Sequence, residues 1–270
     1  MPDTAPAPQF PDYRFAPNIG GHPDVYEIEN RALDRAGHVL DAMRALAPWA
    51  GKTIVDLGCG TGFWLPRYAG QAARVIGIEP DPAVRARAEA RVRDLPGTEV
   101  RAGSAEHTGL PDHSADVVHA RFAYFFPPGT DAGLTEVLRV LRPGGALIMV
   151  DNDYRWGEFA ELLSAASSRP TRAVAADVDE WWRARGASRH EVRSDWRFAR
   201  REDLAAVLGI EFPERVGRDW LARHPAATGL TYGYVLFAVR ACGRFPVGRR
   251  LIGAGGRTGP VSPRIKSYSR

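Results

Sequence analysis

Short apolar segments alternate with helical segments between residues 53 and 151, and this alternation limits the possible folds more than any other feature of the chain. Strands that alternate with helices predict right-handed crossover connections and a mainly parallel sheet. The apolar segments contain few polar positions, which fits strands buried under helices on both faces of the sheet. We therefore expect an α/β fold. The predicted strands are residues 53–57, 75–79, 98–103, 115–122 and 146–151.

The first fifty residues predict two different structures. Residues 1–18 contain five prolines, which is typical of an extended arm. Within residues 19–50, apolar side chains recur every three or four positions from 24 to 47, and this spacing predicts one amphipathic helix. Pro48 and Gly51 are expected to end that helix.

We expect one main domain over residues 51–240. Its second part, residues 154–225, carries a mainly helical pattern, and residues 230–239 form the strongest late strand. A second extended segment is expected at 189–198. The predicted helices of this part are residues 156–167, 177–185, 201–208 and 214–223.

The net charge of +4 belongs to the end of the chain. Residues 241–270 hold seven basic and no acidic side chains, whereas the other 240 residues hold 29 basic and 32 acidic ones. We expect a disordered basic tail and no basic face on the folded body, which argues against nucleic-acid binding. The longest apolar runs, residues 146–150 and 234–239, are too short to cross a bilayer, so we expect a cytoplasmic protein without membrane contact.

A glycine-rich loop, VDLGCGTGFW, follows the first predicted strand. The strand ends in Asp56, and Gly58, Gly60 and Gly62 alternate before the next helix. Glycine accepts positive φ and has no Cβ, and the helix amino terminus adds unpaired N–H groups. Glu79 ends the following strand, 21 residues after Gly58, and parallel strands bring both to one edge of the sheet. The combination predicts a nucleoside site in which a carboxylate accepts hydrogen bonds from ribose hydroxyls.

The loop fits a dinucleotide less well. The dinucleotide pattern G-x-G-x-x-G would place its third glycine where this chain has Phe63. Asp56 would be a poor neighbour for a pyrophosphate but suits a ligand with an ammonium group. A short-chain dehydrogenase would also need Tyr-x-x-x-Lys, and neither Lys52 nor Lys266 has a tyrosine four residues before it.

Four segments in order resemble motifs of the class I S-adenosylmethionine-dependent methyltransferases, in particular the type 11 group. They are residues 56–62, 79–81, 103–106 and 141–145, the last followed by ALIMVD. The resemblance covers about residues 50–152. It implies a Rossmann-like, doubly wound, three-layer αβα fold for the methyltransferase domain, with a mainly parallel seven-stranded sheet. The last strand of that sheet would run antiparallel, and residues 231–239 are the candidate.

The resemblance also implies roles for individual residues. The backbone of the loop would hold the methionine end of S-adenosylmethionine, Glu79 the ribose, Pro80 one face of the adenine, and Ala105 or Glu106 its amino edge. The helix within 19–50 would cover the cofactor. The implied cofactor-binding residues are Asp56, Gly58, Cys59, Gly60, Thr61, Gly62, Glu79, Pro80, Ser104, Ala105, Glu106 and Arg121.

The acceptor is expected at the ends of the fourth and fifth strands. The segment HARFAYFFPP after the fourth strand is apolar and aromatic, which favours a small aromatic or hydrophobic acceptor. Residues 154–225 carry further aromatics that are expected on the substrate side. We expect no metal, because Arg121 would oppose a cation beside Asp151. The candidate catalytic residues are Tyr124, His119 and Asp151, and the candidate substrate-side residues are Tyr26, Phe122 and Asp153.

Several functions stay open on the sequence alone. Methyl transfer to a small molecule is the leading interpretation, and a nucleotide-dependent oxidoreductase is the second. A protein that binds S-adenosylmethionine without catalysis is a third, because the chemistry requires so few side chains. Methylation of RNA such as tRNA is a fourth, and it predicts salt-sensitive binding that weakens when residues 241–270 are removed.

Overall fold

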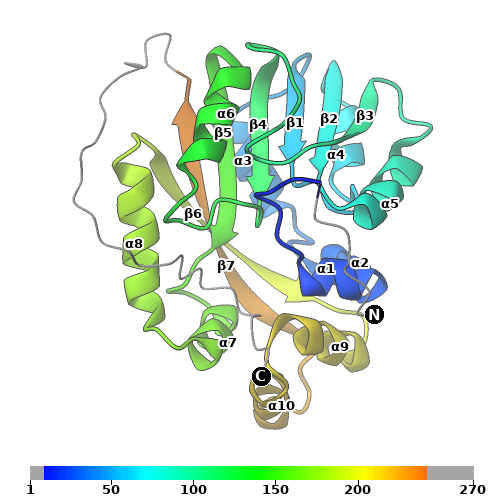
Figure 1. Cartoon of the computed structure of the whole chain (residues 1–270). Coiled ribbons are helices and arrows are strands. Elements are labelled where there is room, and N and C mark those ends of the chain that lie inside the picture. Colours follow the sequence, from blue (N-terminus) through cyan, green and yellow to red (C-terminus); the bar gives the residue numbers. More distant parts are fainter. Residues whose placement is uncertain (1–8, 242–270) are drawn as a thin grey trace, which may run out of the picture.

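A computed structural model describes residues 9–241, and its centre is a seven-stranded sheet in the order β3-β2-β1-β4-β5-β7-β6 (Figure 1). The strands are β1 Thr53–Leu57, β2 Arg74–Glu79, β3 Thr98–Ala102, β4 Ala115–Arg121, β5 Leu141–Asn152, β6 Ser188–Arg197 and β7 Gly229–Arg240. β7 is antiparallel to both of its neighbours, and the pairs from β3 to β5 are parallel. The expected mainly parallel sheet with a reversed last strand is confirmed.

Helices cover both faces of this sheet. α6 and α8 pack on one face through Val137, Val178 and Trp182. α3, α4 and α5 pack on the other, where Met43, Tyr68 and other apolar side chains meet the strands. The helices are α1 Pro17–Gly21, α2 Pro23–Ala32, α3 His38–Leu46, α4 Leu65–Ala69, α5 Pro82–Val92, α6 Asp131–Val140, α7 Glu158–Ala166, α8 Thr171–Arg183, α9 Arg201–Glu211 and α10 Glu214–Arg223.

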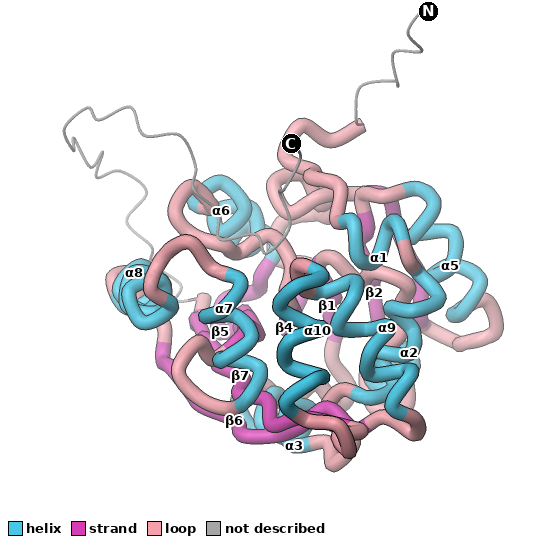
Figure 2. Tube along the Cα trace, turned by 90° about the horizontal axis from the view of Figure 1, so that it is seen from below, coloured by secondary structure: helices cyan, strands magenta, loops and turns pink. Residues whose placement is uncertain are grey.

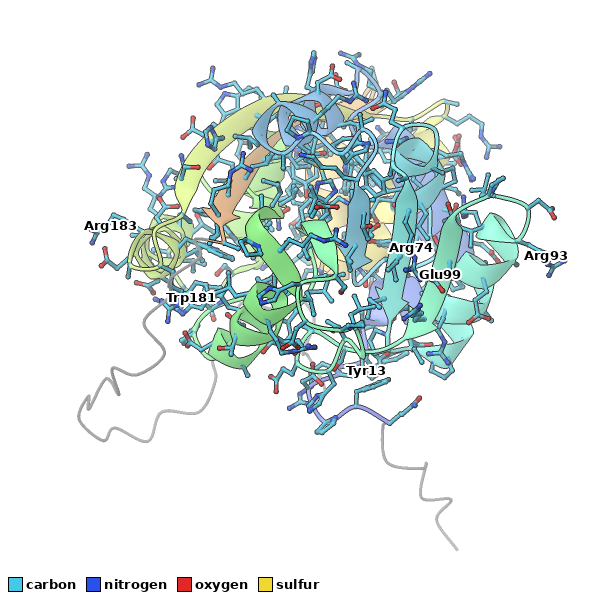
Figure 3. The ribbon with its side chains drawn as sticks, turned by 90° about the horizontal axis from the view of Figure 1, so that it is seen from above. Tyr13, Arg74, Arg93, Glu99, Trp181 and Arg183 are labelled. Carbon is cyan, nitrogen blue, oxygen red and sulfur yellow. The ribbon has the colours of Figure 1, made fainter. Side chains whose placement is uncertain are left out.

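A group of helices gathers at the carboxyl ends of the parallel strands. α1, α2, α7, α9 and α10 lie below the strands in Figure 1, and the view from that side in Figure 2 shows them in front of the sheet, with α7 over β5. At the opposite end of the sheet, where the parallel strands begin, ion pairs lie on the surface. There Arg74 and Glu99 join neighbouring strands across 2.5 Å, as Figure 3 shows. The two ends of the sheet therefore differ, because this group of helices covers only the carboxyl ends of the parallel strands.

The single helix expected over residues 24–47 is wrong. The chain forms α2 and α3 instead, separated by a turn in which Asp34 and Gly37 have positive φ. Asp34 causes the break, because its carboxylate accepts hydrogen bonds from the amide of Val39 (2.8 Å) and the hydroxyl of Ser194 (2.6 Å). A side chain that bonds nearby backbone groups competes with helix continuation.

The terminal predictions are tested only in part. Residues 9–16 follow an irregular path, and α1 begins at Pro17, so the predicted arm of 1–18 ends in a short helix. Residues 1–8 and nearly all of the predicted tail, 242–270, lie outside the described residues. No helix within residues 9–241 is long and apolar enough to cross a membrane.

Candidate functional site

A cavity of about 1140 Å³ opens at the carboxyl ends of β1, β2 and β4. Its walls come from the amino-terminal arm, α1, α2, the glycine-rich loop and segments near residues 103–106, 121–129, 152–159, 210–211 and 232. This volume exceeds the range of about 300–1,000 Å³ that holds a drug-sized ligand. The cavity therefore has room for a nucleoside and a second small molecule.

The glycine-rich loop presents bare backbone to this cavity. Gly58 and Gly60 line it, with φ of 69° and 59°. A Cβ built on Gly58 would lie 2.6 Å from the Cβ of Ala123, and one on Gly60 would lie 2.8 Å from Ile19 Cδ1. Glycine is required here because a side chain would have neither the space nor the backbone conformation. Gly62, also at positive φ, packs against Ala88 instead and does not line the cavity.

Glu79 faces the loop from the end of β2. Its carboxylate accepts hydrogen bonds from the amides of Gly60 and Asp81, both at 2.9 Å. The side chain lines the cavity but is mostly buried, and this burial raises its pKa from 4.5 to about 7. The carboxylate that the sequence predicted for a ribose therefore lies beside the bare loop.

Asp56 and Arg121 form a buried ion pair under the loop. Arg121 Nη2 lies 3.0 Å from Asp56 Oδ2, and the guanidinium lies over the ring of Trp64 with 4.4 Å to the centroid. Arg121 lines the cavity, whereas Asp56 is fully buried and does not. Burial raises the pKa of Asp56, although the charge of Arg121 acts in the opposite direction. The second oxygen of Asp56, Oδ1, has no hydrogen-bond partner among the residues that the structure describes.

The loop after β3 lies where the sequence predicted an adenine contact. Ser104, Ala105 and Glu106 line the cavity, as do Cys59, Thr61 and Pro80. Ser104 is 3% exposed and its hydroxyl has no hydrogen-bond partner within residues 9–241. An unsatisfied buried hydroxyl costs free energy, so a ligand group that bonds to it would gain affinity.

Tyr124, a predicted catalytic residue, lines the cavity in a left-handed conformation with φ of 57°. Its hydroxyl donates to Glu106 Oε1 (2.7 Å) and accepts from the amide of Gly133 (3.1 Å). Burial and the bond to Glu106 raise the pKa of this phenol. The arrangement fits a residue that orders the loop after β3 better than one that removes a proton from a substrate.

The other two predicted catalytic residues do not line the cavity. His119 is fully buried against Trp49 and Tyr68, with ring centroids 5.4 and 5.2 Å away, and burial lowers its pKa to about 3. Asp151 is buried within the sheet, where burial raises its pKa to about 7. Both placements favour a structural role, because a base must reach the proton that it removes.

The predicted substrate-side residues divide in the same way. Tyr26 and Phe122 line the cavity. Asp153 does not, because its carboxylate turns to the amide of Arg155 (3.0 Å) and lies 3.9 Å from Arg189. Asn152 occupies the cavity wall in its place.

The arm over residues 12–21 was not predicted as part of the site. The hydroxyl of Tyr13 donates to Asp81 Oδ2 (2.6 Å), and Asn18 Nδ2 donates to Glu211 Oε1 (2.7 Å). Figure 3 shows Tyr13 where the arm runs along the edge of the molecule. These contacts tie the arm across the cavity between α5 and α9. Its proline-rich composition gave no signal of them, because both partners lie far away in the sequence.

Several further side chains line the cavity that the sequence did not single out by number. Phe159 and Tyr232 line the cavity and stack on each other with 3.9 Å between ring centroids. Glu29 on α2 and Glu211 at the end of α9 line the same region. Tyr154 and Phe159 are the aromatics of residues 154–225 that line the cavity, and the other aromatics of this region do not.

The described residues contain no group suited to a metal ion. Within residues 9–241, no three His, Cys, Asp or Glu side chains come together as ligands. The lining is nevertheless compatible with S-adenosylmethionine, because it offers a bare loop, a carboxylate beside it and, in the loop after β3, a hydroxyl without a partner among the described residues. All three observations concern the residues that the motifs had singled out.

Comparison with known proteins points in one direction. A model for the methyltransferase domain matches residues 55–149. An uncharacterised methyltransferase of Mycobacterium tuberculosis is 30% identical over 227 residues, which cover 77% of this chain and 90% of that protein. Aklanonic acid methyltransferase DauC of a Streptomyces species is 28% identical over 166 residues, 60% of this chain and 74% of DauC.

The fold has solved counterparts. A chain of the complex between the Haloferax volcanii Trm112 methyltransferase activator and a methyltransferase superposes with a TM-score of 0.55. The superposition covers 86% of this chain and 99% of that one at 20% sequence identity. At this identity the likeness extends to the fold alone.

Proposed function

The chain belongs to the methyltransferase domain family, and from that membership we propose that it transfers a methyl group from S-adenosylmethionine to a small-molecule acceptor. One observation carries the proposal. The buried carboxylate of Glu79 lies against the bare backbone of Gly60, at the mouth of a cavity large enough for two ligands. A pyrophosphate would add negative charge beside the buried carboxylate of Glu79, so a phosphate-free adenosyl group suits this geometry better.

The adenosine half of the cofactor would occupy the part of the cavity between β2 and the loop after β3. Glu79 would accept hydrogen bonds from the two ribose hydroxyls, because its carboxylate is an acceptor in the ionised form. Pro80 would pack on the adenine. The unsatisfied hydroxyl of Ser104 and the amide of Ala105 are the nearby groups available to its polar edge.

The methionine half would lie along the glycine-rich loop. Backbone groups of Gly58 to Thr61 would approach it without side-chain interference. Arg121 supplies the cation for the carboxylate of the ligand, and it is held by Asp56 and Trp64. Asp56 would act mainly by positioning Arg121 and the loop, since it does not reach the cavity.

The bound cofactor supplies an activated methyl group on a sulfonium. The residues of the chain then have to align an acceptor with that group and to exclude water, and orientation alone is worth roughly 7–11 kcal/mol. Tyr26 and Phe122 line the cavity beside the loop and support such a role. The arm tied by Tyr13 and Asn18 would close the site from solvent.

Calorimetric titration tests this proposal directly. The purified full chain is titrated with S-adenosylhomocysteine, the demethylated product, and separately with NADPH. We expect heat of binding with the first and none with the second. Binding of NADPH alone would favour an oxidoreductase, and binding of neither would contradict the proposal.

A further inference from the structure

We propose that Asp12 of the amino-terminal arm reads the adenine of the cofactor, by accepting a hydrogen bond from its exocyclic amino group. The inference rests on the proposed function, because it assigns a further residue to the nucleoside half of the same cavity. It also extends the cofactor site to a residue that precedes all of the sequence motifs.

Asp12 lies against the loop after β3. Its carboxylate oxygen Oδ2 accepts a hydrogen bond from the amide of Glu106 at 3.2 Å. Asp12 lines the cavity together with Ser104, Ala105 and Glu106. Its charge also acts on the phenol of Tyr124 and helps to raise the pKa of that group. The arm therefore brings a carboxylate to the part of the cavity that is proposed to hold the adenine.

The Asp12 carboxylate uses little of its capacity to accept hydrogen bonds. The side chain is 5% exposed, and Oδ1 has no hydrogen-bond partner within residues 9–241. Nδ1 of the exposed His107 lies 3.8 Å from Oδ1, beyond hydrogen-bond distance. An ionised carboxylate offers about four acceptor positions, and the amide of Glu106 occupies one of them. A ligand N–H that reaches this buried carboxylate would therefore gain affinity.

The other polar groups of this wall suit the amino group less well. The side chain of Glu106 already accepts the hydroxyl of Tyr124 at 2.7 Å. The amide of Ala105 is a donor, so it suits a ring nitrogen of the adenine. Ser104 offers a neutral hydroxyl, and hydrogen bonds to an ionised group are roughly twice as strong as those between neutral groups. Asp12 is therefore the strongest acceptor that remains for the amino group.

The arm is fixed on both sides of the proposed nucleoside position. Asp12 contacts the loop after β3, and the hydroxyl of the next residue, Tyr13, donates to Asp81 Oδ2 at 2.6 Å. Asp81 follows Glu79 and Pro80 at the end of β2. The arm thus bridges the two segments between which the adenosine half is proposed to lie. Asp12 would hold the edge of the base while Glu79 holds the ribose.

The test uses two ligands that differ only in the amino group. They are S-adenosylhomocysteine and its 6-desamino analogue, in which purine replaces adenine. The analogue keeps every ring nitrogen but lacks both amino N–H donors. The full chain is titrated with each ligand by calorimetry. We expect the parent to bind S-adenosylhomocysteine at least about 10-fold tighter than the analogue.

Two variants assign this preference to Asp12. Asp12→Ala should reduce the ratio of the two affinities to about twofold or less. Asp12→Asn keeps a neutral acceptor oxygen and should reduce the ratio to about 3-fold. A loss that comes only from loosening the arm weakens both ligands alike, so it cancels in the ratio.

Tyr13→Phe is the matched control. It removes the hydrogen bond to Asp81 from the same arm and leaves the Asp12 carboxylate in place. We expect its ratio of affinities to stay within twofold of the parental value. A fall as large as that in Asp12→Ala would assign the preference to the position of the arm and overturn the inference.

The remaining outcomes separate this inference from the proposed function. If the parent does not bind S-adenosylhomocysteine, the proposed function itself fails. If the parent binds both ligands equally, the function stands and the inference is overturned. The inference is overturned as well if Asp12→Ala keeps the full parental preference.

Discussion

The glycine-rich loop shares one cavity with a second region, which we call the acceptor chamber, but the chain assembles the two over different distances. The acceptor chamber is lined by Tyr26, Glu29, Phe122, Tyr154, Glu211 and Tyr232. Apart from Asp12, the cofactor side is built between residues 56 and 124, from the ends of β1, β2 and β4 and the loops that follow them. The acceptor chamber combines α2, the end of α9 and a residue of β7, which are separated by most of the domain.

The two sides also use different groups. The loop offers backbone at positive φ and one buried carboxylate, Glu79. The chamber is lined by side chains, among them the stacked rings of Phe159 and Tyr232 and the carboxylates of Glu29 and Glu211. Backbone recognition leaves little freedom for substitution, whereas a wall of side chains can change without altering the fold. Enzymes that share one cofactor but act on different acceptors would need a cavity divided in this way.

The largest expected effect is on the cofactor side. Gly58→Ala forces a side chain into positive φ, at about 1–2 kcal/mol, and brings it 2.6 Å from the Cβ of Ala123. We expect affinity for S-adenosylhomocysteine to fall at least about 100-fold by calorimetry. Gly209→Ala is the control, since Gly209 lies in α9 with nothing near its Cβ position. Unchanged affinity in Gly58→Ala would show that the ligand does not use this loop.

Asp151 is buried in β5 outside the cavity wall, and its substitution separates structure from catalysis. Burial raises its pKa from 3.8 to about 7, so the folded state holds the proton more tightly than the unfolded state. The stability from this group is complete below pH 4 and is lost as the pH rises through 7. Asp151→Asn should therefore be more stable than the parent at pH 8, by about 4 kcal/mol, and similar at pH 4.

Denaturant unfolding of Asp151→Asn at both pH values checks this expectation, together with kcat. A catalytic base would instead lose about 10²–10⁴ in rate on substitution. A loss of that size at unchanged stability would return Asp151 to the catalytic site.

The pH dependence of cofactor binding tests Glu79. Its pKa of about 7 means that the accepting carboxylate is a minor form at pH 6 and the main form at pH 8. Affinity for S-adenosylhomocysteine should rise about 10-fold between these values in the parent, because the ribose hydroxyls bond to the ionised form. Glu79→Gln should bind weakly and with no such rise. An equal rise in the variant would assign the titration to another group.

The smallest effect is expected at Tyr124, which contacts the loop after β3 through Glu106. Tyr124→Phe removes a hydrogen bond to Glu106 and one from Gly133, which should loosen the loop after β3. We expect the KM for S-adenosylmethionine to rise about 3-fold, with kcat unchanged within twofold. Steady-state kinetics separate the two values. A fall of about 100-fold in kcat at unchanged KM would make Tyr124 the catalytic base instead.

The same contrast explains what the sequence could predict. The loop and Glu79 are recognisable because spacing along the chain determines their spacing in a parallel sheet. The turn at Asp34 was missed because its hydroxyl partner, Ser194, is 160 residues away. The pairing of Glu211 with Asn18 was missed for the same reason. Contacts that depend on the packing of distant helices leave no periodic pattern in the chain.

Strand position alone also misled the choice of catalytic candidates. His119 lies two residues before Arg121 in β4, yet Arg121 reaches the cavity and His119 is buried beside Trp49. Asp151 and Asn152 differ in the same way at the end of β5. Whether a side chain at the end of a strand reaches the cavity depends on where loops and helices cover that strand. Those loops and helices come from elsewhere in the chain.

A crystal structure of the complex with S-adenosylhomocysteine tests the central claim most directly. The account predicts both ribose hydroxyls within hydrogen-bond distance of the Glu79 carboxylate, the thioether chain along Gly58 and Gly60, and the sulfur facing the acceptor chamber. Density for the adenosyl group inside that chamber, or a ribose that makes no contact with Glu79, would contradict it.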